Sequence, residues 1–250
     1  SLDFLGFGAQ CIDPNHDGRP DLVIVNGHVD DFTHKDIPYK MRPQFFLNRG
    51  GRFDELIGTD LLGDGPLGAG EQGFFATPSL GRGLAVLDWN RDGRTDLVTS
   101  RLEERSALVS DTSTIRPNAL RVKLVAVTGA RDAIGARLEW SPPTGRQSRQ
   151  LFGGDGYHAS NERCVDFGGG GDVTSGDLRI VWPGGRVQTV ANVASGREVL
   201  VIEGRTDPLT ITLWLPHEAT VSETAVRAAN PRPAFVSKAP ITAADNTAAP

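Results

Sequence analysis

The chain has 250 residues, with 30 glycines, 16 prolines and a formal net charge of −5 at pH 7. This length allows one or two domains, and the many turn residues favour short strands over long helices. No stripe of Lys and Arg with interleaved aromatic residues occurs, which argues against nucleic-acid binding. No apolar run approaches the ~20 residues that a membrane-spanning helix needs. The composition therefore predicts an all-β protein that neither binds nucleic acid nor spans a membrane.

The first predicted element is an oxygen-rich loop between two short strands in residues 1–30. Residues 13–21 read Asp-Pro-Asn-His-Asp-Gly-Arg-Pro-Asp, with a carboxylate or amide oxygen at loop positions 1, 3, 5 and 9. Gly18, at position 6, tolerates the positive φ of a sharp turn. Ca²⁺ takes six to eight oxygen ligands, some of them backbone carbonyls. The predicted calcium ligands are Asp13, Asn15, Asp17 and Asp21 with the main-chain carbonyl of Arg19, whereas His16 is expected to be solvated.

Residues 44–56 predict a β-hairpin, since the Asn-Arg-Gly-Gly segment between its two apolar runs supplies a turn. Residues 58–73 are rich in glycine and predict a long surface loop. The next element, residues 88–96, reads Asp-Trp-Asn-Arg-Asp-Gly-Arg-Thr-Asp and repeats the first loop. Its predicted calcium ligands are Asp88, Asn90, Asp92 and Asp96 with the main-chain carbonyl of Arg94.

Neither loop is an EF-hand. An EF-hand carries a bidentate Glu at position 12 and helices on both sides. Position 12 is Ile24 in the first loop and Thr99 in the second, and short β-branched runs that predict buried strands follow both loops. A pair of Asx turns without metal is the alternative, because Asp, Asn and Gly are common in turns. The repetition of the whole oxygen pattern favours metal.

A second region, residues 118–206, predicts a β-sandwich or a small barrel. Residues 120–127 and 178–182 alternate between apolar and polar, residues 199–203 form an apolar run, and Gly- or Pro-containing turns separate these segments. Residues 207–250 predict a terminal strand followed by a disordered tail rich in Pro and Ala. The only two cysteines are Cys11 and Cys164. Their spacing fits no metal or redox motif, and the sequence leaves open whether they pair.

Several of these motifs resemble known repeats and domains. Residues 7–29 and 81–100 resemble FG-GAP (VCBS) repeats through the two Asp loops and the segments that precede them. Residues 118–204 resemble the ASPIC/UnbV domain of cartilage acidic protein-like chains of the bacterial type, on motifs at 131–136, 153–157 and 182–185. The resemblance implies partial FG-GAP β-propeller blades in residues 1–117, held by Ca²⁺, followed by a sandwich-like ASPIC/UnbV domain.

The chain departs from this pattern in two respects. Asp166 precedes the Phe-Gly step where the family usually has His, and three glycines follow that step. Propellers close with four to eight blades, whereas residues 1–117 hold about two blade equivalents of ~40–60 residues. We therefore expect the missing N-terminal blades, and a signal peptide, in a longer full-length protein.

These features lead to one principal functional expectation and two alternatives. The principal one is a secreted or surface-attached calcium-binding module for interaction or adhesion, outside the cell or in the periplasm, whose protein or glycan ligand is unidentified. The first alternative is an accessory or catalytic protein of a biosynthetic or carbohydrate-processing system, with Asp155, His158 and Ser160 as a weak candidate group. The second is sugar binding by the sandwich through Trp140, Tyr157 and Trp182, although large aromatics are usually buried.

Overall fold

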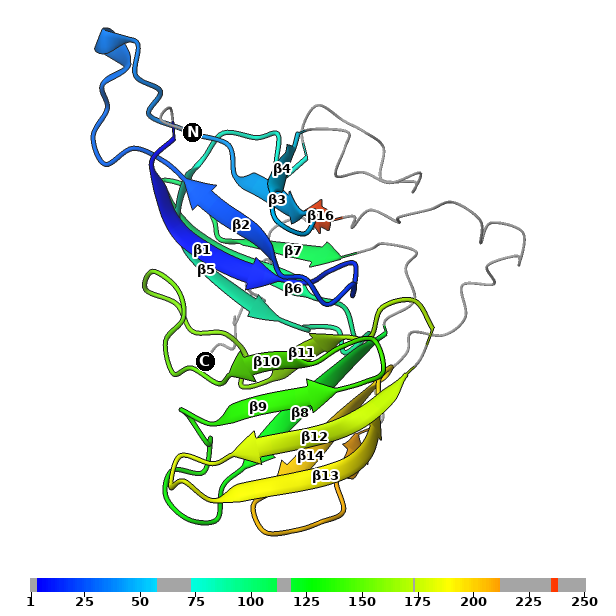
Figure 1. Cartoon of the computed structure of the whole chain (residues 1–250). Coiled ribbons are helices and arrows are strands. Elements are labelled where there is room, and N and C mark those ends of the chain that lie inside the picture. Colours follow the sequence, from blue (N-terminus) through cyan, green and yellow to red (C-terminus); the bar gives the residue numbers. More distant parts are fainter. Residues whose placement is uncertain (1–3, 58–72, 112–117, 173, 212–234, 238–250) are drawn as a thin grey trace, which may run out of the picture.

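The computed structural model describes residues 4–57, 73–111, 118–172, 174–211 and 235–237 (Figure 1). In these residues the chain forms strands and one short 3-10 helix, η1 (Thr33–Lys35). The strands make four sheets of four strands each, so the all-β prediction is confirmed. No helix in the described part of the chain is long and apolar enough to cross a bilayer. Most of the predicted loop at 58–73 lies outside the described residues.

The first sheet contains β1 (Gly6–Ile12), β2 (Asp21–Asn26), β3 (Gln44–Asn48) and β4 (Phe53–Leu56), paired antiparallel in that order. Residues 13–21, called loop 1 below, join β1 to β2, so the predicted passage from loop into strand is confirmed. The predicted hairpin is also confirmed, because β3 pairs with β4. Its turn places Gly50 and Gly51 at φ 76° and 110°, where glycine is favoured.

The second sheet repeats this arrangement. It contains β5 (Leu80–Leu87), β6 (Asp96–Leu102), β7 (Ala107–Asp111) and β16 (Phe235–Ser237), in the order β5-β6-β7-β16. Residues 88–96, called loop 2, join β5 to β6. Residues 235–237, within the segment for which a disordered tail was predicted, form β16, which pairs antiparallel with β7. The free backbone groups of a sheet edge accept such an added strand.

The first two sheets pack against each other around a shared core. Glycines allow the close approach: a Cβ at Gly8 would lie 2.7 Å from Cβ of Leu84, and one at Gly81 would lie 2.7 Å from Cβ of Val25. The buried apolar residues are Ile12, Val23, Val25, Phe45, Leu47, Leu56, Phe74, Phe75, Leu84, Leu97, Ala107 and Val109. The sheets do not close into a ring within the described residues, so the propeller remains a prediction.

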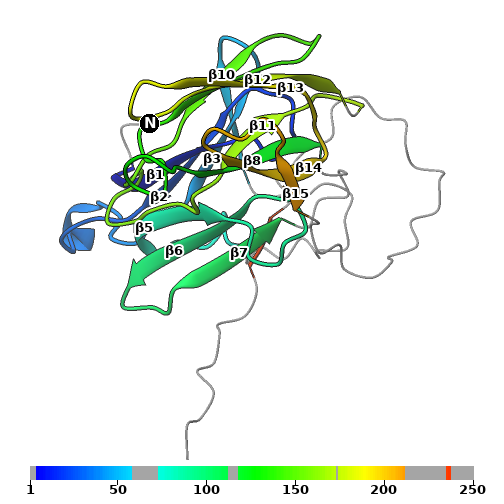
Figure 2. The same cartoon turned by 90° about the horizontal axis from the view of Figure 1, so that it is seen from below.

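The remaining two sheets face each other as a sandwich (Figures 1 and 2). One has the order β11-β8-β14-β15, formed by β11 (Val165–Gly168), β8 (Ala119–Val125), β14 (Arg197–Ile202) and β15 (Leu209–Ile211). The other has the order β10-β9-β12-β13, formed by β10 (Gln147–Gln150), β9 (Arg137–Ser141), β12 (Ser175–Val181) and β13 (Val187–Ala194). The predicted strands at 120–127, 178–182 and 199–203 correspond to β8, β12 and β14.

Alternating side chains from both sheets fill the sandwich core. In β12, Leu178 and Ile180 are fully buried while Asp177 and Arg179 are exposed, as period-two alternation predicts. Trp140 and Trp182 are also buried, with relative exposures of 0% and 2%. These two tryptophans therefore belong to the core and present no face for stacking on a sugar.

Candidate cation-binding loops

Loops 1 and 2 adopt the same backbone conformation. His16 and Arg91, at loop position 4, have φ of 55° and 59°. Gly18 and Gly93, at position 6, have φ of 84° and 83°. The backbone enters the left-handed region at positions 4 and 6, and this produces the sharp turn. Glycine at position 6 adopts the more positive φ without strain. The sequence repeat is thus also a structural repeat.

Carboxylates at positions 1 and 5 close both loops in the same way. In loop 1, Asp13 accepts hydrogen bonds from the amides of Asp17 (3.0 Å) and Gly18 (2.8 Å). In loop 2, Asp88 accepts them from the amides of Asp92 (3.1 Å) and Gly93 (3.0 Å). The position 5 carboxylates accept hydrogen bonds from the backbone amides of the position 7 arginines, at 2.8 Å in loop 1 and 2.9 Å in loop 2. Each predicted ligand loop is therefore preformed around its first aspartate.

The side chains of the position 7 arginines form ion pairs within their own loops, which the sequence reasoning did not predict. The Arg19 guanidinium pairs with Asp17 at 2.6 Å, and the Arg94 guanidinium pairs with Asp92 at 3.2 Å. Each arginine thus offsets one of the three carboxylates of its loop, in addition to the main-chain carbonyl proposed as a ligand. The shared Asp-Gly-Arg segment was the available signal, because residues two apart in a turn can bring their side chains together.

Loop 1 holds two carboxyl groups whose pKa values are raised by burial, and one of them has an oxygen without a partner in the described residues. Burial raises the pKa of Asp13 to about 7, and the neighbouring Asp17 acts in the same direction. Burial also raises the pKa of Asp21 to about 7, although one of its oxygens accepts the Asn48 amide at 2.7 Å. Asp21 is fully buried, and its Oδ2 has no hydrogen-bond partner in the described part of the chain. A divalent cation would satisfy this oxygen and reduce the repulsion among the three carboxylates.

The donor set is not made of carboxylates alone. Within the described residues, no group of three or more His, Cys, Asp and Glu side chains lies together as a metal cluster. A calcium ion in loop 1 would therefore depend on the amide oxygen of Asn15 and on backbone carbonyls in addition to Asp13 and Asp21. Such mixed oxygen sets are ordinary for Ca²⁺, which accepts carbonyl and amide ligands alongside carboxylates.

Loop 2 has a different environment, because a guanidinium from the sandwich enters it. Nη1 of Arg121, on β8, lies 3.1 Å from Oδ2 of Asp88, and both side chains are almost completely buried. Burial raises the pKa of Asp88, with Arg121 opposing this effect. Burial also raises the pKa of Asp96 to about 7, although both its oxygens accept hydrogen bonds, from the amides of Asp111 (2.9 Å) and Trp89 (3.1 Å).

Arg121 is the centre of an ionic network between loop 2 and the sandwich. Its guanidinium also lies 3.3 Å from Glu162 and 3.3 Å from Asp166. Lys123 pairs with Glu162 and with the buried Glu198, both at 3.0 Å. Burial alone would raise the pKa of Glu162, but the hydrogen bond from Lys123 and the charge of Arg121 outweigh it and lower this pKa to about 2. The sequence reasoning did not connect these residues into a network. For Arg121 and Lys123 the available signal was their polar side chains within an apolar strand.

Loop 1 meets the sandwich through backbone contacts instead. The Gly170 amide donates to the His16 carbonyl at 2.8 Å, and a Cβ at Gly168 would collide with Asp13 and with the backbone of Gly18. His16 is buried, with a relative exposure of 5%, so the expectation of a solvated side chain is wrong. Burial, reinforced by Arg94 and Arg121, lowers the pKa of His16 to about 4. The side chain at position 4 of loop 1 is thus covered by the sandwich rather than by solvent.

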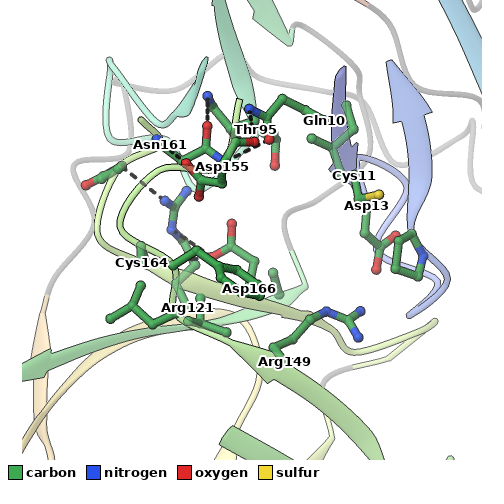
Figure 3. Close-up of a pocket in the computed structure, with 18 of the residues that line it drawn as sticks. Gln10, Cys11, Asp13, Thr95, Arg121, Arg149, Asp155, Asn161, Cys164 and Asp166 are labelled. Carbon is green, nitrogen blue, oxygen red and sulfur yellow. Dashed lines mark hydrogen bonds and ion pairs between the residues drawn. The ribbon is translucent and has the colours of Figure 1, made fainter. Parts of the chain in front are cut away.

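A cleft of about 830 Å³ separates β1 and loop 1 from β10 and β11 (Figure 3). Arg149 reaches into it, with its guanidinium 5.8 Å from the centre of the Phe167 ring and no carboxylate within ion-pair distance among the described residues. Cys11 and Cys164 lie on opposite sides of the cleft, and both thiols are free. Burial raises the pKa of Cys164, so its thiol is uncharged at neutral pH.

The weak catalytic candidates do not form a catalytic group in the described structure. The Ser160 hydroxyl donates to the Gly153 carbonyl at 3.1 Å, and the Asp155 carboxylate accepts the Asn161 amide at 2.9 Å. His158 is exposed at φ 48°, with its ring against Tyr157. No hydrogen bond links any two of the three candidates within the described residues, and each has an ordinary structural role.

Comparison with known proteins gives one result for the sandwich. No curated protein matches the chain. The two Asp loops and Arg121 lie outside the segment that a family model recognises. Residues 126–208, which contain most of the sandwich, match the family model described as ASPIC and UnbV.

Proposed function

We propose that the chain is a calcium-binding interaction module. In this proposal the two N-terminal sheets are blade-like FG-GAP units whose Asp loops face the C-terminal sandwich, and a bound cation strengthens the junction between them. The single observation that carries the proposal is the buried Oδ2 of Asp21, which has no partner in the described residues although it lies in a preformed loop of oxygen ligands. Leaving such an atom unsatisfied costs about 1–3 kcal/mol, which a cation would recover.

The proposal also includes a location and a class of partner. Loops of this kind in extracellular modules bind Ca²⁺ at about 10⁻⁴–10⁻³ M, which is the range found outside cells. We therefore place the module outside the cell, at its surface or in the periplasm. The partner is a protein or a glycan, and the exposed surfaces of the sheets provide its binding area.

A calcium titration of thermal stability tests the proposal. A cation at about a hundredfold its dissociation constant adds ~2.7 kcal/mol, which corresponds to ~5–10 °C in melting temperature for a chain of this size. We expect this rise for the wild type in millimolar Ca²⁺, a rise no more than about half as large for Asp21→Asn, and an unaltered rise for the control Asp30→Asn, which changes an exposed aspartate outside the loops. An equal response of the wild type and Asp21→Asn would contradict the proposal.

A second function, binding of a small polar ligand such as a sugar unit, is supported by the cleft. Phe152 lines it with 52% of its surface exposed, beside the polar side chains of Gln150 and Arg149. An apolar ring next to groups that donate and accept hydrogen bonds is a common arrangement in small-molecule sites. Screening of mono- and disaccharides by ligand-observed NMR would test it. Binding that persists unchanged in both Phe152→Ala and Arg149→Ala would exclude the cleft as the site.

A further inference from the structure

The two loops differ at position 2, and this difference decides whether the last aspartate has a free oxygen. In loop 2, position 2 is Trp89, whose amide donates to Oδ2 of Asp96 at 3.1 Å. In loop 1, position 2 is Pro14. Proline has no N–H, so the equivalent bond cannot form. The corresponding atom, Oδ2 of Asp21, is therefore left buried without a partner in the described residues, whereas Asp96 is satisfied at both oxygens.

The loops also differ in the charge that faces position 1. Asp88 of loop 2 has a guanidinium at 3.1 Å, supplied by the buried Arg121. Asp13 of loop 1 has no ion pair within the described residues, and Arg149 influences it only from beyond ion-pair distance. A fixed positive charge next to Asp88 opposes the entry of a second cation, because like charges repel strongly where water is excluded. Both differences thus favour cation binding in loop 1 over cation binding in loop 2.

We propose that the chain has a single cation site, in loop 1, and that Arg121 of the sandwich takes the place of the cation in loop 2. This inference rests on the proposed calcium function and restricts it. Loop 1 then responds to calcium, whereas loop 2 is a metal-independent connection between its sheet and β8. The hydrogen bonds that the side chains at positions 1, 3 and 5 accept from loop amides are the same in both loops, so the spacing of these residues alone would assign two equivalent sites.

Stoichiometry and a matched pair of variants test this inference. The 250-residue chain is titrated with Ca²⁺ by calorimetry, and with Tb³⁺ by luminescence, for the wild type, Asp21→Asn and Asp96→Asn. These substitutions remove the same charge from the same loop position. We expect one ion per chain for the wild type, at least a tenfold loss of affinity for Asp21→Asn and less than a twofold change for Asp96→Asn. Circular dichroism establishes that each variant is folded.

The possible outcomes separate the inference from the function on which it rests. Two ions per chain, one of them lost in Asp96→Asn, would overturn the single-site inference while calcium binding stands. One ion that is lost in Asp96→Asn and kept in Asp21→Asn would also overturn it. No binding at all would overturn both. If a variant does not fold, anomalous scattering from wild-type crystals soaked in Tb³⁺ decides the question, with a peak at loop 1 and none at loop 2 as the expected result.

Discussion

Arg121 and Asp88 are 33 residues apart in the chain, and they form an ion pair of 3.1 Å in which both side chains are almost completely buried. The pair joins the sandwich to the loop between β5 and β6, and Glu162 and Asp166 extend it on the sandwich side. A buried charge without its partner is strongly unfavourable, so each member of this network depends on the others.

Replacing Arg121 with Met should therefore destabilise the protein. The substitution leaves Asp88 and its acidic neighbours buried without their principal counter-charge, and removal of one partner of a buried pair costs about 3–5 kcal/mol. Urea unfolding would measure the change. The control is Arg179→Met, which removes a largely exposed guanidinium 3.5 Å from Glu139 and should cost about 0–1 kcal/mol. Similar losses for the two variants would show that the Arg121 network does not stabilise the fold.

The Glu162 carboxyl should make part of the stability depend on pH. Lys123 and Arg121 lower its pKa in the folded protein to about 2, below the 4.5 of the free side chain. Because the pKa is lower in the folded protein, the unfolded chain binds more protons as the pH falls. The contribution of the ionised Glu162 to the free energy of unfolding is therefore complete above about pH 5 and declines as the pH falls toward 2. The stability difference between the wild type and Glu162→Gln should narrow between pH 7 and pH 3.5. A difference that stays constant over this range would argue against the ion pairs.

Substitution of Gly168 by Ala should disturb the junction between loop 1 and the sandwich. The added methyl would overlap the Asp13 carboxylate and the Gly18 backbone, so one or both would have to move. Overpacking of this kind typically costs about 1–3 kcal/mol, and proteolysis within residues 13–21 should become faster. Gly184→Ala is the matched control, because a Cβ there meets nothing within 4 Å. Equal protease resistance of the two variants would mean that loop 1 is not packed against Gly168.

The two cysteines should differ in reactivity. Cys11 is exposed, whereas burial raises the pKa of Cys164 and keeps it as the less reactive thiol. A thiol reagent such as DTNB should label Cys11 rapidly in the native protein, and the partly buried Cys164 more slowly. Labelling of neither residue until a reductant is added would indicate that the two form a disulfide. The variants Cys11→Ser and Cys164→Ser identify which thiol gives each phase.

Substitution of Trp140 should destabilise the sandwich core. This side chain is fully buried, and its indole N–H donates to the Val193 carbonyl at 3.1 Å. Trp140→Ala should cost about 3–5 kcal/mol, because it creates a cavity and leaves a carbonyl unsatisfied. Val187→Ala, at an exposed position of β13, is the control and should change stability by less than about 0.5 kcal/mol. A small effect at Trp140 would mean that its ring is available at the surface.

Several features of this protein were determined by local sequence. The spacing of Asp, Asn and Gly in residues 13–21 and 88–96 predicted two equivalent loops, and each leads into a buried strand as expected. The alternation around Leu178 predicted β12, in which Leu178 and Ile180 are buried. These predictions succeeded because turn geometry and strand periodicity depend on residues that are close together in the chain.

Only the tertiary structure decided what surrounds each loop. Sequence spacing treats loops 1 and 2 as equals, because it contains no information about the charges that fold against them. Arg121 reaches Asp88 from a strand of the other domain, and His16 is buried rather than solvated because Gly168 and Gly170 cover loop 1. The absence of an N–H at Pro14 is visible in the sequence, but its effect on Asp21 follows only from burial and from the hydrogen bond that Trp89 makes to Asp96. Electrostatic environment and desolvation depend on neighbours that are distant in the chain, and folding alone brings these together.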